Sequence, residues 1–299
     1  MLAVPVVGGG AAPRVPARPA QAAPPALELR IGGSWAPWRS FEPGAPAVRD
    51  TLLERATVWR DHAPGLSIGA FEVRTPGHLW TNSVAIVAVD PRVLRFELDA
   101  PPGWARRTAE EALRDSGVVL AVNTGLFRAN GTPQGLVLDR GRRRSALAGW
   151  LDAVVVVEDG RLRVTDNQGT RALGALGEGA SAFQTLPWLV REGRVVLGVT
   201  SGVRLSRDHR DRRFTLCLDG DGSVRFLLSN FEVFGQAAGR IPVGLTIPEQ
   251  TVIAAAAGCR DAVALDGGIS AQLAVRGSAR VHRMPGWRRV PLLLVARRR

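Results

Sequence analysis

The sequence contains no lysine and no tyrosine, so all 39 of its basic residues are arginines. With 27 acidic residues, the formal net charge is +12. The complete absence of two residue types indicates a genome-wide compositional bias, so this charge alone does not predict nucleic-acid binding. The aromatic residues do not interleave with the arginines as a stacking surface for single strands requires. We therefore expect no specific nucleic-acid partner, although a basic rim could attract an anionic substrate such as a phosphodiester or an acidic glycan.

Several other patterns are missing. No apolar run approaches the ~20 residues needed to span a bilayer, which predicts that the chain has no transmembrane segment. The four histidines show no HxH or HExxH spacing, so we predict no metal site and no cofactor. A Gly-x-Ser-x-Gly nucleophile turn is also absent. Carboxylates, amides, arginines and backbone N–H groups remain as the chemical repertoire.

Only two cysteines are present, Cys217 and Cys259, and both lie in apolar surroundings. The sequence favours buried free thiols. A single disulfide is the alternative, if the strand containing Cys217 passes the helix end containing Cys259.

Three segments differ in composition. Residues 1–26 are rich in Ala, Pro and Gly, which predicts a disordered leader or the remnant of an export signal. Residues 27–65 are predicted to be an irregular lead-in, whose tryptophans Trp35, Trp38 and Trp59 are interpreted as core residues more readily than as a sugar-stacking surface. Residues 66–299 are predicted to form the main domain. We expect an exported protein, periplasmic or extracellular.

Short apolar runs separated by turns predict many strands and only a few helices. This pattern favours an α+β fold with mixed or antiparallel sheets on which the helices pack. The predicted strands are 66–73, 82–89, 92–98 and 290–295, and the predicted hairpins are 154–158 with 161–164 and 213–218 with 224–228.

The most informative stretch is 261–270, DAVALDGGIS, because an apolar strand ends at Asp266 directly before two glycines. Glycines allow positive φ and let a ligand approach the backbone closely. A carboxylate that a strand places before a glycine turn is a candidate active-site acid. A tight turn capped by Asp266 explains the same residues equally well.

The same construction occurs earlier in the chain. In each copy a Thr-x-x-Glu capping box starts a helix, a glycine ends it, and a strand then leads into a polar glycine turn. The copies could be related by a pseudo-twofold axis that brings Asn123 and Asp266 to one cleft, or they could be similar by chance. The first copy comprises 108–111, Gly117, 118–122 and 123–125, and the second comprises 246–249, Gly258, 262–265 and 266–268.

Seven motifs, in order across roughly residues 66–296, resemble the phosphodiester glycosidase family. Order and spacing together are more specific than any one motif. The family patterns are N-G-G-F-F followed by G, P-x-L-V-x-x-G, R-T-A-I-G, G-M-T-L-x-E, L-D-G-G-G-S and R-x-V. The matching segments are 121–127 (AVNTGLF), 133–137 (PQGLV), 186–193 (LPWLVREG), 213–217 (RFTLC), 244–249 (GLTIPE), 265–270 (LDGGIS) and 288–290 (RRV).

The resemblance implies a hydrolase that acts on a sugar-1-phosphodiester or a related glycan linkage, such as one in a bacterial exopolysaccharide, without a cofactor. Its partner is then a carbohydrate or sugar-phosphate substrate. The catalytic residues implied are Asp266, Asn123 and Arg213, with Arg213 able to hold the phosphate bidentately. The substrate-binding residues implied are Gly125, Gly267, Gly268, Ser270 and Arg288.

Three residues depart from the family pattern: Thr124, Phe214 and Ile269. Ile269 stands where the family has a third glycine, and a β-branched residue at a positive φ would be strained. The alternative function is therefore a non-catalytic member that binds glycans or assembles with other proteins. Glu249 is a candidate second carboxylate, although its capping box already explains it.

Overall fold

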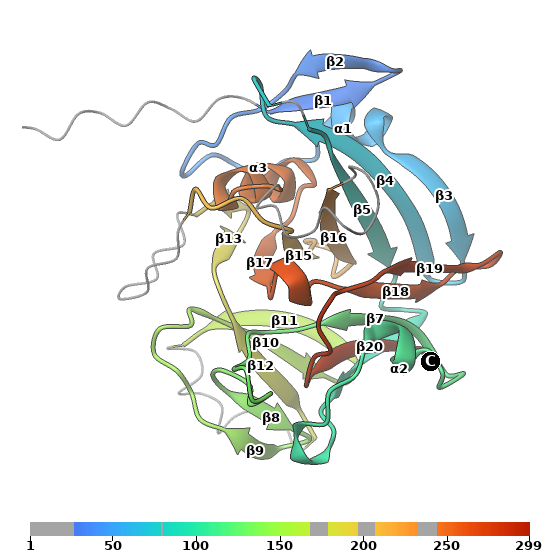
Figure 1. Ribbon diagram of the computed structural model, residues 1–299, viewed down its shortest axis with the longest axis vertical. Helices are drawn as coiled ribbons and strands as arrows, with labels where there is room; N and C mark the ends of the chain where they lie inside the picture. The colour runs from blue at the N-terminus through green and yellow to red at the C-terminus, as the bar shows by residue number, and fades with distance from the viewer. Residues whose placement is uncertain (1–26, 79, 168–178, 197–206, 232–243) are drawn as a thin grey trace, which may run out of the picture.

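The computed structural model describes residues 27–78, 80–167, 179–196, 207–231 and 244–299. The predicted leader, residues 1–26, lies outside them. Within the described residues the strands form three sheets, and all strand pairs are antiparallel. Few helices accompany them (Figure 1). The prediction of antiparallel sheets with few helices is confirmed, whereas the pseudo-twofold relationship stays a prediction.

The largest sheet has ten strands in the order β14-β13-β17-β15-β16-β5-β4-β1-β2, and β3 pairs with β4. Burial alternates along its long strands, as expected where one face packs on the core. The strands are β1 (Glu28–Ile31), β2 (Ser34–Pro37), β3 (Val58–Ala63), β4 (Leu66–Arg74), β5 (Asn82–Val89), β13 (Trp188–Arg191), β14 (Arg194–Val195), β15 (Phe214–Leu218), β16 (Val224–Phe231) and β17 (Asp261–Leu265).

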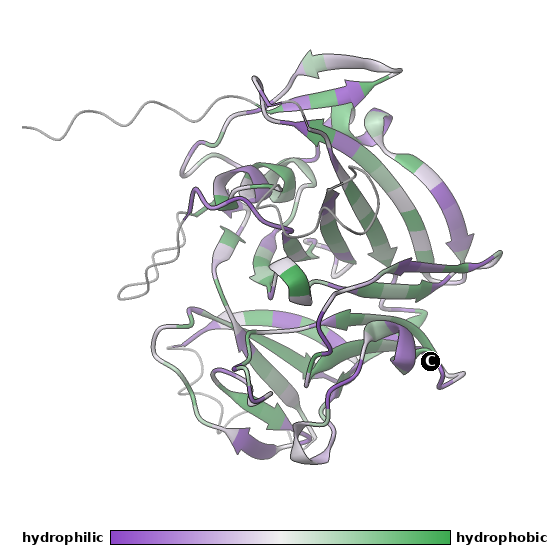
Figure 2. Cartoon of the chain, viewed as in Figure 1, coloured by the Kyte–Doolittle hydropathy of each residue, from purple (hydrophilic) through white to green (hydrophobic). Residues whose placement is uncertain are grey.

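Two five-stranded sheets complete the structure, in the orders β11-β10-β12-β8-β9 and β19-β18-β7-β20-β6. Their central strands are the more hydrophobic ones, and the edge strands β9 and β19 are hydrophilic (Figure 2). The first comprises β8 (Val137–Asp139), β9 (Arg142–Ser145), β10 (Ala153–Glu158), β11 (Arg161–Asp166) and β12 (Ser181–Thr185). The second comprises β6 (Leu94–Asp99), β7 (Val118–Asn123), β18 (Leu273–Arg276), β19 (Val281–Met284) and β20 (Leu293–Arg298).

The helices are short, and both predicted capping boxes are present. In α3 (Ile247–Ala256), Thr246 caps the first turn and Gly258, with a φ of 75°, follows the last one. Nearly every side chain of α3 is buried, because the helix packs between the large sheet and the segment that contains α1 (Thr51–Ala56). The other helix, α2 (Ala109–Ala112), ends well before Gly117, which was predicted to end it.

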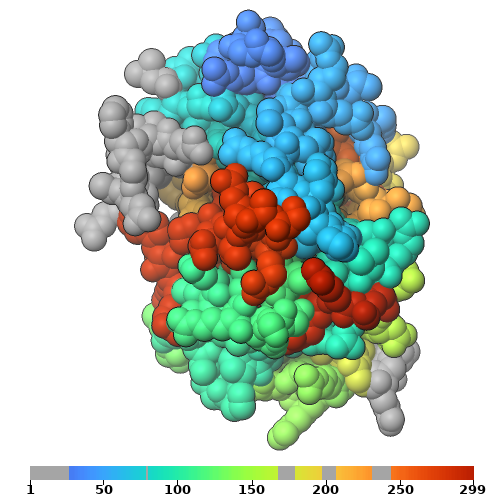
Figure 3. Space-filling view, turned by 90° about the vertical axis from the view of Figure 1, so that its right-hand side faces the viewer, coloured from blue at the N-terminus to red at the C-terminus, as the bar shows by residue number. Residues whose placement is uncertain are grey.

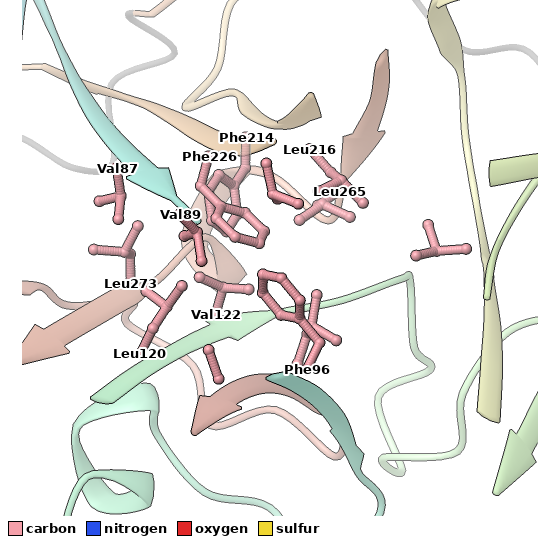
Figure 4. Packing of buried hydrophobic residues seen from close by; sticks show 14 of the residues in the cluster. Val87, Val89, Phe96, Leu120, Val122, Phe214, Leu216, Phe226, Leu265 and Leu273 are labelled. Atoms are coloured by element: carbon pink, nitrogen blue, oxygen red, sulfur yellow. The ribbon is translucent and has the colours of Figure 1, made fainter. Parts of the chain in front are cut away.

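The main core lies where the three sheets meet, and it anchors the strands that lead to the candidate site (Figure 4). Val122 and Leu265 are buried directly before Asn123 and Asp266, and Phe214 is buried directly after Arg213. Close packing of such residues restricts movement of the strand ends. The core therefore holds Asn123, Arg213 and Asp266 at the ends of three rigid strands.

Two features differ from the sequence analysis. Residues 27–65 contain β1, β2, α1 and β3, so this segment belongs to the large sheet and is not irregular. The two cysteines form a disulfide, Cys217–Cys259, because β15 passes the end of α3. None of the helices within the described ranges is long and apolar enough to cross a membrane.

Candidate active site

The two glycine turns predicted from the sequence are bonded directly to each other. The Asn123 side-chain amide donates to the main-chain oxygen of Asp266 at 2.7 Å, and the main-chain N–H of Asp266 donates to the Thr124 oxygen at 2.8 Å. Asn123 Oδ1 accepts from the Gln272 N–H, also at 2.8 Å. Because the amide of Asn123 is engaged on both sides and buried, this residue positions the Asp266 turn.

Asp266 lies just past the end of β17 and is partly buried. Burial raises the pKa of its carboxyl to about 7. A hydrogen bond with Ser270 and the positive charge of Arg288 act in the opposite direction, while the negative charge of Asp211 adds to the rise. A carboxyl that is half ionised near neutral pH is suited to proton transfer.

The glycines of the site allow segments of backbone to approach closely. A Cβ on Gly267 would lie 2.6 Å from the Arg212 oxygen, and one on Gly268, whose φ is 58°, would lie 2.8 Å from Asp211 Oδ2. Gly125 faces the Gln184 oxygen so closely that a Cβ would overlap it. These contacts leave no room for a side chain at any of the three positions, which explains why each is glycine. The Gly268 N–H donates to the Arg212 oxygen at 2.9 Å.

Arg213 lies opposite Asp266 in register, because the neighbouring pair is Phe214 with Leu265. Its guanidinium, however, binds backbone: Nε donates to the Leu245 oxygen at 2.8 Å and Nη2 to the His209 oxygen. These bonds fix the loop before α3. Arg213 is thus adjacent to the site, with its guanidinium held by two main-chain oxygens of that loop.

Arg288 has a different environment. Its guanidinium carbon lies 4.8 Å from the centroid of the Phe127 ring, and its main-chain N–H donates to the Ile269 oxygen at 3.2 Å. Within the described part of the chain, its side chain makes no hydrogen bond or ion pair. A guanidinium stacked on a ring keeps its N–H donors for another partner, so Arg288 is the better placed of the two arginines to receive an anion.

Two residues of the site were not predicted. Asp211 adds a second carboxylate beside the Gly268 turn. Arg212 donates from Nη1 to the Pro285 oxygen at 3.0 Å, and its buried Nε has no partner within the described ranges. Their position directly before Arg213 is the signal that could have identified them, because the strand that begins there runs beside β17.

Glu249, the candidate second carboxylate of the sequence analysis, is fully engaged elsewhere. It completes the capping box of α3, accepts two hydrogen bonds from Arg210 at 2.9 Å and one from Thr75 at 2.6 Å. Burial favours a higher pKa, but these bonds hold the pKa of Glu249 below its usual value. Glu249 therefore has a structural role.

Asp152 is another carboxyl whose pKa is raised by burial, to about 6. Its Oδ2 is 3.5 Å from the Trp188 N–H, and its main-chain oxygen accepts from the Trp188 indole at 2.9 Å. These contacts join the start of β10 to β13. Asp152 therefore has a packing role at Trp188, and no hydrogen bond between described residues connects it with Asp266.

The sequence decides the family. Residues 116–296 match the sequence profile of the phosphodiester glycosidases. The chain belongs to this family. The match covers more than half of the 299 residues and includes Asn123, Arg213, Asp266 and Arg288. Comparison with curated proteins gives no significant match.

Solved structures with the same fold have low sequence identity to this family member. The catalytic domain of zebrafish N-acetylglucosamine-1-phosphodiester alpha-N-acetylglucosaminidase, auto-inhibited by its pro-peptide, aligns with a TM-score of 0.61 and 16% identity over 82% of this chain and 89% of that one. A hypothetical protein from Synechocystis gives 0.57 and 16%, over 79% and 62%. A candidate exported protein from Burkholderia pseudomallei gives 0.53 and 15%, over 73% and 74%. The chain thus spans less than two thirds of the Synechocystis protein.

The family's third glycine is replaced by Ile269, but this replacement does not strain the turn. Positive φ falls on Gly268, whereas Ile269 has no positive φ and lies within the short helix η4 (Gly268–Ser270). Its side chain is 50% exposed, next to the equally exposed Trp287, whose N–H donates to the Ile269 oxygen at 2.8 Å. Ile269 therefore adds an apolar group beside the turn without distorting it.

Proposed function

We propose that this phosphodiester glycosidase is an active hydrolase that releases a sugar from a sugar-1-phosphodiester. Asp266 is the base that activates water. The observation that supports this role best is the combination of a carboxyl with a pKa near 7 and a turn held by Asn123. A base whose pKa lies near the working pH is the most effective proton acceptor.

In the proposed reaction, water adds its hydroxyl to the anomeric carbon and its remaining proton passes to Asp266. The bond between the anomeric carbon and the bridging oxygen breaks, and its electron pair leaves with a phosphate monoester. Because this leaving group is already weakly basic, it needs no strong acid. Arg288 stabilises its charge, and the Asp211 carboxylate favours the positive charge that builds up on the sugar.

The substrate class follows the zebrafish relative, whose name is that of an alpha-N-acetylglucosaminidase acting on an N-acetylglucosamine-1-phosphodiester. The first compound to test is therefore methyl α-N-acetylglucosamine-1-phosphate. We further propose that the chain is exported, since structural disulfides persist in oxidising compartments and Cys217–Cys259 is one.

The test is the release of reducing sugar from this compound and from the α- and β-linked glucose and mannose analogues. We expect turnover by the wild type and a loss of at least ~100-fold in Asp266→Asn. Asp159→Asn is the matched control, because it makes the same chemical change in the exposed turn between β10 and β11. If the wild type hydrolyses none of these diesters and Ile269→Gly does, the non-catalytic alternative is correct.

A further inference from the structure

A cleft of about 770 Å³ lies away from Asp266, at the other end of α3. Ala256 and Ala257, at the C-terminal end of the helix, line it. The candidate active site is near the N-terminal end, where Arg213 binds the Leu245 oxygen. Ten residues of helix separate the two ends by ~15 Å. The cleft therefore requires its own explanation.

One wall of the cleft carries an exposed tryptophan. Trp59 lies on the edge strand β3, where a β-bulge falls between Trp59 and Asp61. Its side chain is 43% exposed, although the sequence analysis favoured a core position. Gly69 pairs with Trp59 on the neighbouring strand β4, and a Cβ on Gly69 would lie 3.0 Å from the indole. The ring therefore packs against the backbone of Gly69. Bulges commonly re-aim a side chain, and Trp59 lines the cleft. The chain segment around β3 lies on the surface of the molecule (Figure 3, light blue).

The polar groups of the cleft are held by one another. Asp219 pairs with Arg225 and, at 2.8 Å, with Arg49, and Asp90 pairs with Arg92 at 2.9 Å. With Glu54, the three carboxylates equal the three arginines, so the cleft has no net formal charge despite the +12 of the chain. It offers paired N–H donors and carboxylate acceptors without a local excess of positive charge that would select a polyanion.

We propose that this cleft binds a segment of neutral oligosaccharide. A sugar ring has an apolar face of C–H groups and a rim of hydroxyls, which match an exposed indole beside paired guanidinium and carboxylate groups. The volume is within the range of sites that enclose small ligands. An acidic glycan or a nucleic acid would leave its charges uncompensated here. The inference concerns binding alone and is independent of hydrolysis at Asp266.

The experiment is calorimetric titration of the whole protein with four neutral tetrasaccharides, namely malto-, cello-, manno- and chitotetraose, and with acidic tetragalacturonate. We expect at least one neutral compound to bind, and Trp59→Ala to weaken it by about 10-fold or more. Trp59→Phe should retain part of the affinity. Trp287→Ala is the matched control, because it removes a similarly exposed tryptophan that is bonded to Ile269 in the Asp266 turn, and it should leave this binding unchanged. Circular dichroism and the Tm verify that each variant is folded.

Three results would overturn the inference. The first is no binding of any neutral tetrasaccharide up to about 10 mM. The second is binding that Trp287→Ala abolishes and Trp59→Ala does not, which would place the sugar at Asp266. The third is preferential binding of tetragalacturonate. If the enzyme is active, Trp59→Ala should still hydrolyse a small methyl phosphodiester at the wild-type rate, so failure of this inference is distinguishable from failure of the proposed function.

Discussion

The Asn123 side chain holds the main-chain oxygen of Asp266 at 2.7 Å, although the two residues are 143 positions apart in the sequence. The return bond from the Asp266 N–H to the Thr124 oxygen makes the contact reciprocal. Two strands from different sheets, β7 and β17, therefore end against each other. The position of the carboxyl depends on this junction as much as on its own strand.

Asn123→Ala should reduce both stability and turnover. It leaves the Gln272 N–H and the Asp266 oxygen without partners, at a cost of ~1–3 kcal/mol in the free energy of unfolding. Because Asn123 positions Asp266, we expect kcat to fall more than KM rises. Urea unfolding and steady-state kinetics measure the two effects. Asn130→Ala is the control: it removes only one exposed turn bond, from the Thr132 N–H, so it should cost less stability and leave turnover unchanged. An unchanged kcat in Asn123→Ala would contradict the positioning role.

The rate should increase with pH around 7, as Asp266 loses its proton and becomes a base. Asp211→Asn removes a negative charge that raises the pKa of Asp266, so the rising limb should move to lower pH. The measurement is kcat/KM between pH 5 and 9. A rate that falls through pH 7 would show that Asp266 works as an acid.

Stability should change in the opposite direction. The folded pKa of Asp266 is raised, so the folded state binds more protons than the unfolded chain between about pH 4 and pH 7, and stability falls as the pH rises through this window. Asp266→Asn removes this effect. At pH 8 the variant should be more stable than the wild type, by at most ~4 kcal/mol, and the difference should disappear near pH 4. Equal pH dependence in the two proteins would contradict the raised pKa.

The two arginines should behave differently when replaced. Arg288→Met should raise KM for a phosphodiester by about 10-fold or more with little change in stability, since its side chain has only the stacking contact with Phe127 within the described residues. Arg213→Met should instead destabilise the fold by ~1–3 kcal/mol, because the Leu245 and His209 oxygens lose their donor. Kinetics and thermal unfolding of both variants test this. The reverse pattern would restore Arg213 as the phosphate ligand.

Reduction of Cys217–Cys259 should lower stability. The bridge closes a loop with a sequence separation of 42, for which chain entropy gives ~4 kcal/mol, and engineered examples often deliver less. We expect the Cys217→Ala/Cys259→Ala variant to lose ~2–4 kcal/mol, measured by urea unfolding. A wild type that unfolds identically with and without a reductant would show that the bridge does not form.

The sequence predicted those parts of the fold that depend on local pattern. The alternation in β4 and β5, the capping boxes at Thr108 and Thr246, and the strand before Asp266 all follow from periodicity or from turn chemistry. The sequence could not decide between free thiols and a disulfide, because the Cys217–Cys259 bond depends on β15 passing the end of α3. Likewise, the exposure of Trp59 depends on a bulge that periodicity does not show.

The site was harder to predict for the same reason. Asp266 was found because a strand delivers it into glycines, and Asn123 because its strand has the same form. The sequence could not show that Arg213 donates to main-chain oxygens, nor that Asp211 is near Asp266, since both facts arise from a loop packed beside Gly268. Those roles were set by tertiary contacts and not by motif.

Hydrolysis in water enriched in ¹⁸O tests the central claim most directly, because it identifies the bond that breaks. The wild type and methyl α-N-acetylglucosamine-1-phosphate are incubated in labelled water, and the phosphate product is analysed by mass spectrometry. Attack at the anomeric carbon predicts methyl phosphate without ¹⁸O, since the new oxygen goes to the sugar. Methyl phosphate that carries ¹⁸O would show cleavage at phosphorus and contradict the glycosidase mechanism proposed for Asp266.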